Sequence, residues 1–334
     1  MQAISTRLIA GGALASEHMD NLTHSLVGAV LGQAGLKRTT GLAMPALIIG
    51  ANLPDVDAAC FFWLEGTEHL AFRRGITHGP PALVLLPLVL AGLLWAFDRW
   101  QSKRGTRPEG RLPVRFGWLY AMAFVGCLSH PFFDWLNVYG IRLLEPFSSQ
   151  WFYGDTLFII DPWLWAMLIG SVWWSRRREK AETVKWARPA QVGIAAVLAY
   201  IGVNWAITQH VVRETQESLG LSEGVIANPR PIIFFDREVL IRDNGVWWLT
   251  LESSTSQLRE FPNKLSVLPC RIPDLSRERI KNSELDAFLI WWRAPMPERA
   301  EDGSVILYDA RFYDPRARDR FSVALPDVRC EPLP

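Results

Sequence analysis

The stretch PPALVLLPLVLAGLLWAF, residues 80–97, contains no charged side chain. It approaches the length of about 20 apolar residues with which a helix crosses a bilayer. Tryptophan gathers near several ends of this and similar stretches, as it does at membrane interfaces. The pattern predicts a polytopic transmembrane helical bundle, and four buried core helices are the alternative. The other three segments of this kind cover residues 116–141, 156–175 and 189–209.

Two shorter apolar stretches come before these segments, at residues 25–36 and 41–51. Each is shorter than a full membrane span. They predict either short spans or a helical hairpin that is buried among the other helices.

The chain divides into two parts by composition. Its 334 residues suggest about two domains, and its net charge of +1 gives no global field that would attract nucleic acid. We expect a membrane-embedded, mostly α domain at 19–212 and an extramembrane α+β domain at 213–334. Residues 1–18 match a signal peptide poorly, because they have one Arg and a short apolar run. We expect them to be an upstream extension, with Met19 rather than Met1 as the natural start.

Basic loops predict the orientation of the bundle. The loops 98–115 and 175–188 each carry six basic and two acidic residues. Short loops rich in Lys and Arg stay in the cytoplasm, and the turn Lys37–Arg38 fits the same side. The expected protein is therefore a multi-pass membrane protein. Its outer side would hold His24, residues 52–78, residues 130–161 and the chain after about residue 210.

Polar side chains recur on that predicted outer side. Ionisable groups at or in a membrane are energetically expensive, so a functional site is the default hypothesis for them. The pieces are DNLTH (20–24), NLPDVD (52–57), RRGITH (73–78), SHPFFD (129–134), YGDT (153–156) and IIDP (160–163).

His130 and Asp134 share a helix face, because they lie four positions apart. They either bind one metal ion together, or the carboxylate orients the imidazole; a plain hydrogen bond between buried partners is the alternative. Asp55 and Asp57 follow an Asn and a Pro that end the preceding helix. Their carboxylates can point at one centre or bridge two, and turn residues or N-caps are the alternative.

Two further histidines extend this set. His78 begins the next span after a glycine-containing turn, and the planar guanidinium of Arg74 can clamp a phosphate or carboxylate. His24 opens the first apolar helix, where a capping or interfacial role is the alternative. Three His and several Asp without Cys suggest one or two divalent ions, Zn²⁺ or Mn²⁺. Such an ion lowers the pKa of bound water to about 7 and supplies hydroxide for hydrolysis.

Five motifs resemble, in the same order, those of the bacterial membrane-bound metal-dependent hydrolases, the YdjM-like family. They are DNLTHSLVG, NLPDVD, RRGITH, SHPFFDWLNVYG and PFS…WFYGDTLFIIDP, and they cover about residues 19–170. The segments IANPRPIIFFDREVLIR and FLIWWRAPMPE are similar to the C-terminal portion of longer members. The resemblance implies an integral inner-membrane, metal-dependent hydrolase. It also implies a distant similarity to zinc-dependent phospholipase C and the P1-type nucleases, which split phosphoester bonds.

The resemblance also implies roles for single residues. Asp155 and Asp161 match the family's last acidic positions, and we expect one of them to take or deliver a proton. We expect Arg74 to stabilise developing negative charge. A site at the edge of the bilayer meets lipids first, so the expected substrate is a phosphoester of a lipid or a lipid-linked precursor. The implied metal ligands are His24, Asp55, Asp57, His78, His130 and Asp134.

The region after about residue 215 reads as a small α+β domain. Residues 231–252 predict two or three strands with a hairpin turn at Asp243-Asn244-Gly245, and 304–312 predict another. Residues 283–292 predict a helix with a capping signal at Ser283. In a periplasmic domain, Cys270 and Cys330 could pair as a disulfide. We expect Trp247, Trp248, Trp291 and Trp292 to be packing residues rather than a ligand surface.

Two other functions remain open at this point. A transporter would continue its polar residues through the spans to the inner face, but 80–97 and 189–209 have no charged side chain. A metal-stabilised scaffold without turnover would bind the ion with protein ligands alone, whereas a catalytic site keeps a position for water.

Overall fold

The computed structural model describes the chain except residues 1–20, 223, 244–245, 251–269, 316 and 333–334. The described residues form two compact units, and α7 (Arg188–Leu219) contributes to both. One unit contains residues 21–57 and Arg74–Val203, and we call it the helical unit. The other contains Ala58–Arg73 and the chain from Asn204, and we call it the C-terminal unit. Ala58–Arg73 thus groups with residues beyond the boundary expected at 212.

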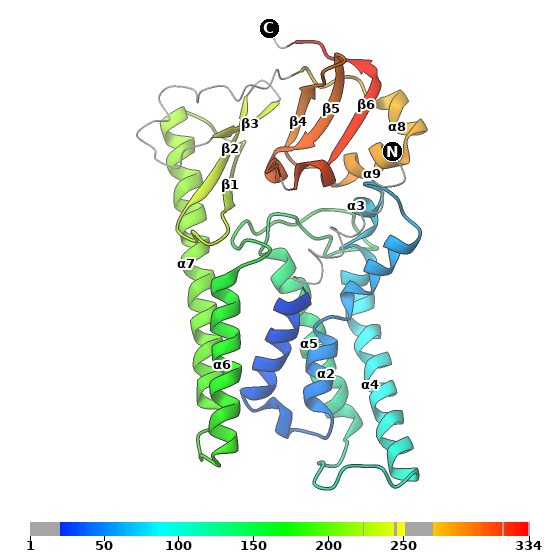
Figure 1. The fold of residues 1–334 in the computed structure, drawn as a ribbon, viewed down its shortest axis with the longest axis vertical. Helices are drawn as coiled ribbons and strands as arrows, with labels where there is room; N and C mark the ends of the chain where they lie inside the picture. The colour runs from blue at the N-terminus through cyan, green and yellow to red at the C-terminus, as the bar shows by residue number, and fades with distance from the viewer. Residues whose placement is uncertain (1–20, 223, 244–245, 251–269, 316, 333–334) are drawn as a thin grey trace. The chain divides into compact units, whose positions relative to one another are not determined.

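The helical unit is mostly α-helical, as expected (Figure 1). Its first described helix covers residues 21–33. The elements that follow in the chain are η1 (Leu36–Arg38), α2 (Ala43–Gly50), η2 (Pro54–Phe62), η3 (Ile76–His78), α4 (Pro80–Lys103), α5 (Phe116–Trp135) and α6 (Pro162–Lys180), and then α7.

Three helices of the described chain, α4, α5 and α7, are long and apolar enough to cross a membrane. They correspond to the expected segments 80–97, 116–141 and 189–209. The pair α2 and η2, bent by 54°, passes the same criterion when taken together, as a broken span or a re-entrant loop. The apolar stretch 41–51 therefore belongs to a bent element.

The expected span over 156–175 has other bounds in the structure, and its crossing of a membrane stays a prediction. The helix in this region, α6, starts only at Pro162 and is not among the helices that meet the length and hydropathy criterion within the described residues. Asp161 explains the late start, because its side chain accepts hydrogen bonds from the N–H groups of Trp163 and Leu164 and caps the helix. At the other end of α6, the apolar part stops before the three arginines at 176–178.

The basic segments of the helical unit gather at one end. In Figure 1 the α4–α5 and α6–α7 connections lie at the end of this unit opposite to the start of α4 and the end of α5. Lys37 of η1 forms an ion pair with Glu179 near the end of α6, which places the third basic segment there as well.

Glycine lets the helices that carry the polar motifs approach closely. A Cβ on Gly126 of α5 would lie 2.5 Å from the carbonyl oxygen of Leu47 in α2, and one on Gly50 would lie 2.6 Å from that of Ala123. A Cβ on Gly28 of the first helix would also meet Leu47 O, at 2.6 Å. Small residues at such crossings are typical of helix packing in membranes. The stretches 25–36 and 41–51 thus pack as a hairpin among the other helices.

The C-terminal unit has two three-stranded antiparallel sheets, ordered β1-β2-β3 and β4-β5-β6. Buried side chains of both sheets form one core, which includes Leu240, Trp247 and Met296. Trp291 of α9 is fully buried, so the expected packing role is confirmed for Trp247 and Trp291. The elements are β1 (Val225–Pro229), β2 (Arg237–Asp243), β3 (Val246–Thr250), α8 (Ser276–Lys281), α9 (Ser283–Trp291), β4 (Pro295–Arg299), β5 (Ser304–Asp309) and β6 (Ser322–Arg329), with α3 (His69–Phe72) packed on α9.

Local details differ from the sequence expectation. β2 and β3 pair as the expected hairpin, with Asp243 opposite Val246, while residues 244 and 245 of the turn lie outside the described chain. Asn282, rather than Ser283, caps α9 by accepting from the N–H of Leu285. β5 ends at Asp309, because the side chain of this residue caps the short 3₁₀ helix that follows.

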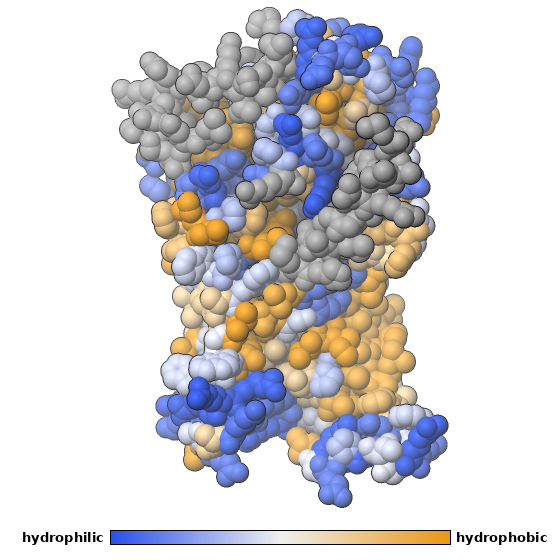
Figure 2. Space-filling model, viewed as in Figure 1, coloured by the Kyte–Doolittle hydropathy of each residue, from blue (hydrophilic) through white to orange (hydrophobic). Residues whose placement is uncertain are grey.

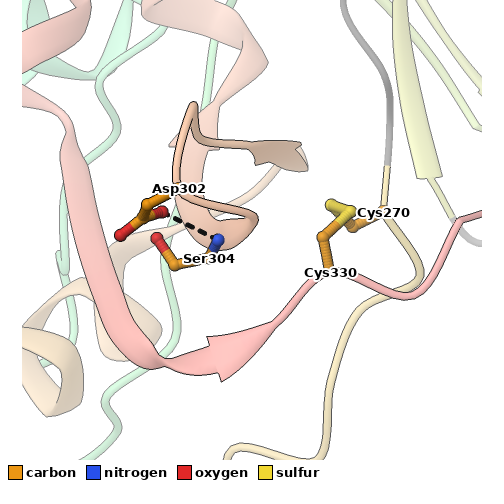
Figure 3. Close-up of a disulfide and its surroundings, with 4 residues drawn as sticks. All are labelled: Cys270, Asp302, Ser304 and Cys330. Atoms are coloured by element: carbon orange, nitrogen blue, oxygen red, sulfur yellow. Dashed lines mark hydrogen bonds between the residues drawn. A yellow bond between two sulfur atoms is a disulfide. The ribbon is translucent and has the colours of Figure 1, made fainter.

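Cys270 and Cys330 form a disulfide bond, which confirms the pairing considered from the sequence (Figure 3). The bond joins the segment before α8 to the residue after β6, across a sequence separation of 60 residues. Disulfides form and persist in oxidising compartments such as the bacterial periplasm.

Replacing both cysteines with alanine is expected to lower the free energy of unfolding of the C-terminal unit by about 4 kcal/mol. That is the chain-entropy effect of a closed loop of this length. Pulse proteolysis of the full chain in increasing urea measures the loss relative to the oxidised wild type. Wild-type protein treated with reductant is the control and should behave like the double variant. Equal stability of the oxidised wild type and the double variant would contradict this expectation.

Candidate metal centre

Three elements of the helical unit bring a small group of His and Asp side chains together. α5 supplies His130 and Asp134 from successive turns of its last part. η2 supplies Asp55 from its first turn, and η3 ends with His78. One ligand atom from each of these four residues lies within 4.8 Å of the other three. The predicted pairing of His130 with Asp134 is therefore part of a larger cluster.

The distances within the cluster match a shared ion. Asp134 Oδ2 lies 3.4 Å from the Nε2 atoms of both His78 and His130. Asp55 Oδ1 lies 3.6 Å from His130 Nε2 and 4.0 Å from His78 Nε2. Ligand atoms about 2.0–2.1 Å from a tetrahedral ion are roughly 3.3 Å apart. A small shortening of the distances between these ligand atoms would therefore accommodate one ion.

Hydrogen bonds orient both imidazoles for metal binding. His130 Nδ1 lies 2.7 Å from the carbonyl oxygen of Ala51, which can only accept, so Nδ1 carries the proton. The lone pair of the neutral ring is then on Nε2, which faces the two carboxylates. A metal-binding His usually donates its other N–H to a carbonyl or carboxylate in this way.

The second imidazole has the same arrangement. The hydroxyl of Thr77 donates to Asp57 Oδ2 at 3.0 Å, and its oxygen lies 2.9 Å from His78 Nδ1. A hydroxyl that has given its proton to a carboxylate accepts from Nδ1–H. His78 Nε2 is buried and has no hydrogen-bond partner among the described residues. Its lone pair therefore points into the cluster.

The charges of the cluster also favour a cation. Asp57 and Asp134 are buried, and Asp55 has a side chain that is only 9% exposed. Arg74 compensates one of these three carboxylates, with Nη2 at 3.1 Å from Asp134 Oδ1. Buried charges are costly unless they are paired or bind a metal. With neutral imidazoles, these carboxylates make the cluster a favourable environment for a divalent cation, so the residues fit a metal.

Arg74 is held tightly beside Asp134. Its Nη1 donates to Asn137 Oδ1 at 3.0 Å, and its guanidinium lies 4.6 Å from the ring centroid of Tyr139. Its φ of 54° is left-handed, which costs a residue other than glycine about 1–2 kcal/mol. This conformation lets its N–H donate to Asp57 Oδ2, while its carbonyl oxygen accepts from the N–H of Arg142. Strain of this kind is concentrated at functional sites.

Asp55 and Asp57 have different positions, although the D-x-D spacing suggested a common centre. They lie on the 3₁₀ helix η2. With about three residues per turn, positions two apart point roughly 120° away from each other. Asp55 faces the cluster, whereas Asp57 Oδ2 accepts from Arg74 N and Thr77 and lies 3.5 Å from His78 Nδ1. The geometry makes Asp57 a positioning residue for His78.

His24 lies next to the four-residue group. Its ring stacks on that of His130 with 3.7 Å between centroids, and its Nε2 is 3.5 Å from Asp134 Oδ1. The side chain is buried. A capping or interfacial role does not account for this position, so His24 belongs to the candidate site.

Asp155 and Asp161 differ from the other predicted site residues. Asp161 caps α6 with Oδ1 and accepts from the hydroxyl of Tyr200 with Oδ2 at 2.9 Å. Both of its oxygens thus have structural partners. Asp155 is half-buried and has a left-handed φ of 47°. Neither is among the four residues whose ligand atoms converge.

The sequence interpretation missed Thr77 and Asn137. Thr77 links Asp57 to His78, and Asn137 Oδ1 accepts from both Arg74 and the N–H of Tyr139. Both lie within the quoted motifs, one position before His78 and three after Asp134. Their closeness in sequence to the candidate ligands is the signal that could have identified them.

These features define a mostly helical protein with apolar helices of membrane-crossing length and a buried His/Asp cluster that can hold a metal ion. The chain belongs to the family of YdjM inner membrane proteins, because the model of this family matches residues 19–211. That match includes every residue of the cluster. No curated protein and no solved structure matches the chain. The wider similarity to phospholipase C and P1-type nucleases is therefore without support.

Replacing Asp57 with Asn is expected to weaken metal binding by about 10–100-fold without abolishing it, as the loss of a supporting partner of a ligating His does. Replacing Asp55 with Asn should have the larger effect, because Asp55 Oδ1 is one of the converging atoms. Competition with a fluorescent chelator measures both affinities. A larger loss in the Asp57 variant would reverse the two roles.

Proposed function

We propose that this protein is an integral membrane hydrolase that uses a divalent metal ion, Zn²⁺ or Mn²⁺, to cleave a phosphoester of a lipid or lipid-linked substrate. The convergence of Asp55, His78, His130 and Asp134 supports this proposal. Two imidazoles and two carboxylates suit either ion, with zinc favoured by the histidines. An ion that accepts six ligands would keep positions for water and substrate.

The chain's own residues have separable tasks in this proposal. Asp55, His78, His130 and Asp134 would hold the ion, and a bound ion would supply Lewis-acid polarisation of the phosphoester and a lowered pKa of water. The Thr77–Asp57 pair keeps the proton of His78 on Nδ1.

The other charged groups act around the ligands. Arg74 fixes Asp134 and places a permanent positive charge where negative charge develops on the substrate. His24 borders the ligands and is available as a further ligand for a second ion. Asp155 remains the candidate for proton transfer, since both oxygens of Asp161 have structural partners.

The proposed placement in the inner membrane has three supports. The family is one of inner membrane proteins. The basic loops lie together at one end of the helical unit, which the positive-inside rule assigns to the cytoplasm (Figure 1). The Cys270–Cys330 disulfide fits a C-terminal unit in the oxidising periplasm. The metal centre would then lie near the periplasmic surface.

The test is hydrolysis by detergent-purified protein after chelation and after reloading with Zn²⁺ or Mn²⁺. Phosphatidic acid and bis(p-nitrophenyl) phosphate serve as lipid and soluble phosphoester probes. We expect metal-dependent release of phosphate or nitrophenol, lost in His130→Ala and kept in His210→Ala, whose side chain is exposed. Protein that binds one ion tightly but cleaves neither probe would favour a metal-stabilised scaffold.

A further inference from the structure

A groove lies between α6 and α7 of the helical unit, apart from the metal centre. Its volume is about 420 Å³, within the range of small-molecule sites. Gly193 forms part of its lining, and a Cβ there would meet Ser171 Oγ at 1.9 Å. The two helices therefore touch beside the groove. The lining also includes Met167, Gly170, Trp174, Arg178, Arg188 and Val192.

Most of this lining is apolar or small. Gly170 is an open position, because a Cβ there would meet no atom within 4 Å. Met167, Val192 and Ala196 add apolar surface. Such an apolar groove between α6 and α7 suits a hydrocarbon chain.

Two arginines supply the charge of the groove. Arg178 lies in the last turn of α6, and Arg188 begins α7. Neither forms an ion pair among the described residues. The Nε of Arg178 is buried and lacks a hydrogen-bond partner there. Glu179, the nearest acidic residue in sequence, pairs with Lys37 instead. Within the described part of the chain, the groove thus has two positive charges that no carboxylate pairs with.

The charged end of the groove coincides with a broader basic surface. The connection 175–188 carries six basic and two acidic residues. Figure 2 shows hydrophilic residues gathered at this end of α6 and α7, below hydrophobic helix surface. Trp174 also lines the groove, and Trp is enriched at the level of lipid headgroups.

We propose that this groove binds one anionic phospholipid, with its headgroup phosphate between Arg178 and Arg188 and one acyl chain along Gly170 and Val192. Basic pockets between transmembrane helices on the cytoplasmic side bind anionic headgroups. The proposal uses the membrane placement of the proposed function but none of its catalytic residues. A zwitterionic lipid such as phosphatidylcholine carries a choline cation beside its phosphate, so it brings no net negative charge to the two arginines.

Native mass spectrometry of the full-length protein in detergent, with added phosphatidylglycerol or phosphatidylcholine, tests this proposal. We expect a phosphatidylglycerol adduct that is several times more abundant than the phosphatidylcholine adduct. Arg178→Gln and Arg188→Gln should each weaken the adduct about fivefold, given about 1 kcal/mol per basic residue near anionic lipid. The control is Arg176→Gln, which removes the same charge from the same helix outside the lining.

A second pair of variants tests the apolar part of the groove. Gly170→Leu adds a side chain at a lining position where a Cβ meets no atom within 4 Å, and it should reduce the adduct at least as strongly. Gly202→Leu in α7 is its matched control, because Gly202 is equally open but does not line the groove. Equal binding of both lipids, or unchanged adducts in Arg178→Gln and Gly170→Leu, would overturn the proposal. Metal content of the same samples reports on the proposed function separately.

Discussion

Replacing His130 with alanine is expected to remove the bound metal ion from the purified protein. Its Nε2 lies 3.4 Å from Asp134 Oδ2 and 3.6 Å from Asp55 Oδ1, at the centre of the cluster. Loss of a ligand should exceed the about 10–100-fold effect of losing a supporting partner. Elemental analysis of the protein after dialysis measures the ion directly. We expect about one ion per chain in the wild type and a small fraction of that in the variant.

Replacing Asp134 with alanine should add a stability defect to the loss of metal. The change removes the carboxylate that lies 3.1 Å from the guanidinium of Arg74, which is buried. Breaking a buried pair by removing one member costs about 3–5 kcal/mol. Thermal denaturation in detergent should therefore separate Asp134→Ala from His130→Ala, and Asp134→Asn, which keeps the shape, should be intermediate.

The control for these variants is His210→Ala, since the side chain of His210 is 76% exposed and pairs only with Glu214 among the described residues. It should retain the wild-type metal content and melting temperature. Unchanged metal content in both His130→Ala and Asp55→Ala would remove the basis for a metal centre at this cluster.

The positions of the side chains in the cluster were predictable from the sequence where a single helix or motif determines them. The spacing of His130 and Asp134 requires a shared helix face, and the structure has it. The difference between Asp55 and Asp57 was not predictable, because it depends on a 3₁₀ rather than an α or extended conformation. The capping role of Asp161 depends on where α6 starts, which apolar composition leaves open.

The fold shows the same division between local and long-range information. Hydropathy identified α4, α5 and α7, because each is a continuous apolar run. The grouping of Ala58–Arg73 with the C-terminal unit was not predictable, since it depends on contacts such as that of Thr67 Oγ1 with the carbonyl oxygen of Glu284. These residues are more than two hundred positions apart, and no sequence periodicity links them.

Replacing Gly126 with leucine is expected to disrupt the metal centre from a distance. A Cβ at this position would lie 2.5 Å from Leu47 O and 3.1 Å from Ala51 N, so it meets backbone atoms that no rotamer change can move. Overpacking of a core typically costs 1–3 kcal/mol, and we expect about 3 kcal/mol or more because two helices must separate. Thermal denaturation in detergent measures this loss.

The same separation should release the metal. One turn beyond Gly126, His130 Nδ1 donates to Ala51 O, and this bond keeps the Nε2 lone pair directed at Asp55 and Asp134. Moving α2 away from α5 breaks that bond, so the ring loses the partner that sets its tautomer. Gly117→Leu is the matched control, since a Cβ on Gly117 of the same helix meets nothing within 4 Å. Gly126→Leu protein with full metal content would show that the close crossing of α2 and α5 is not what positions His130.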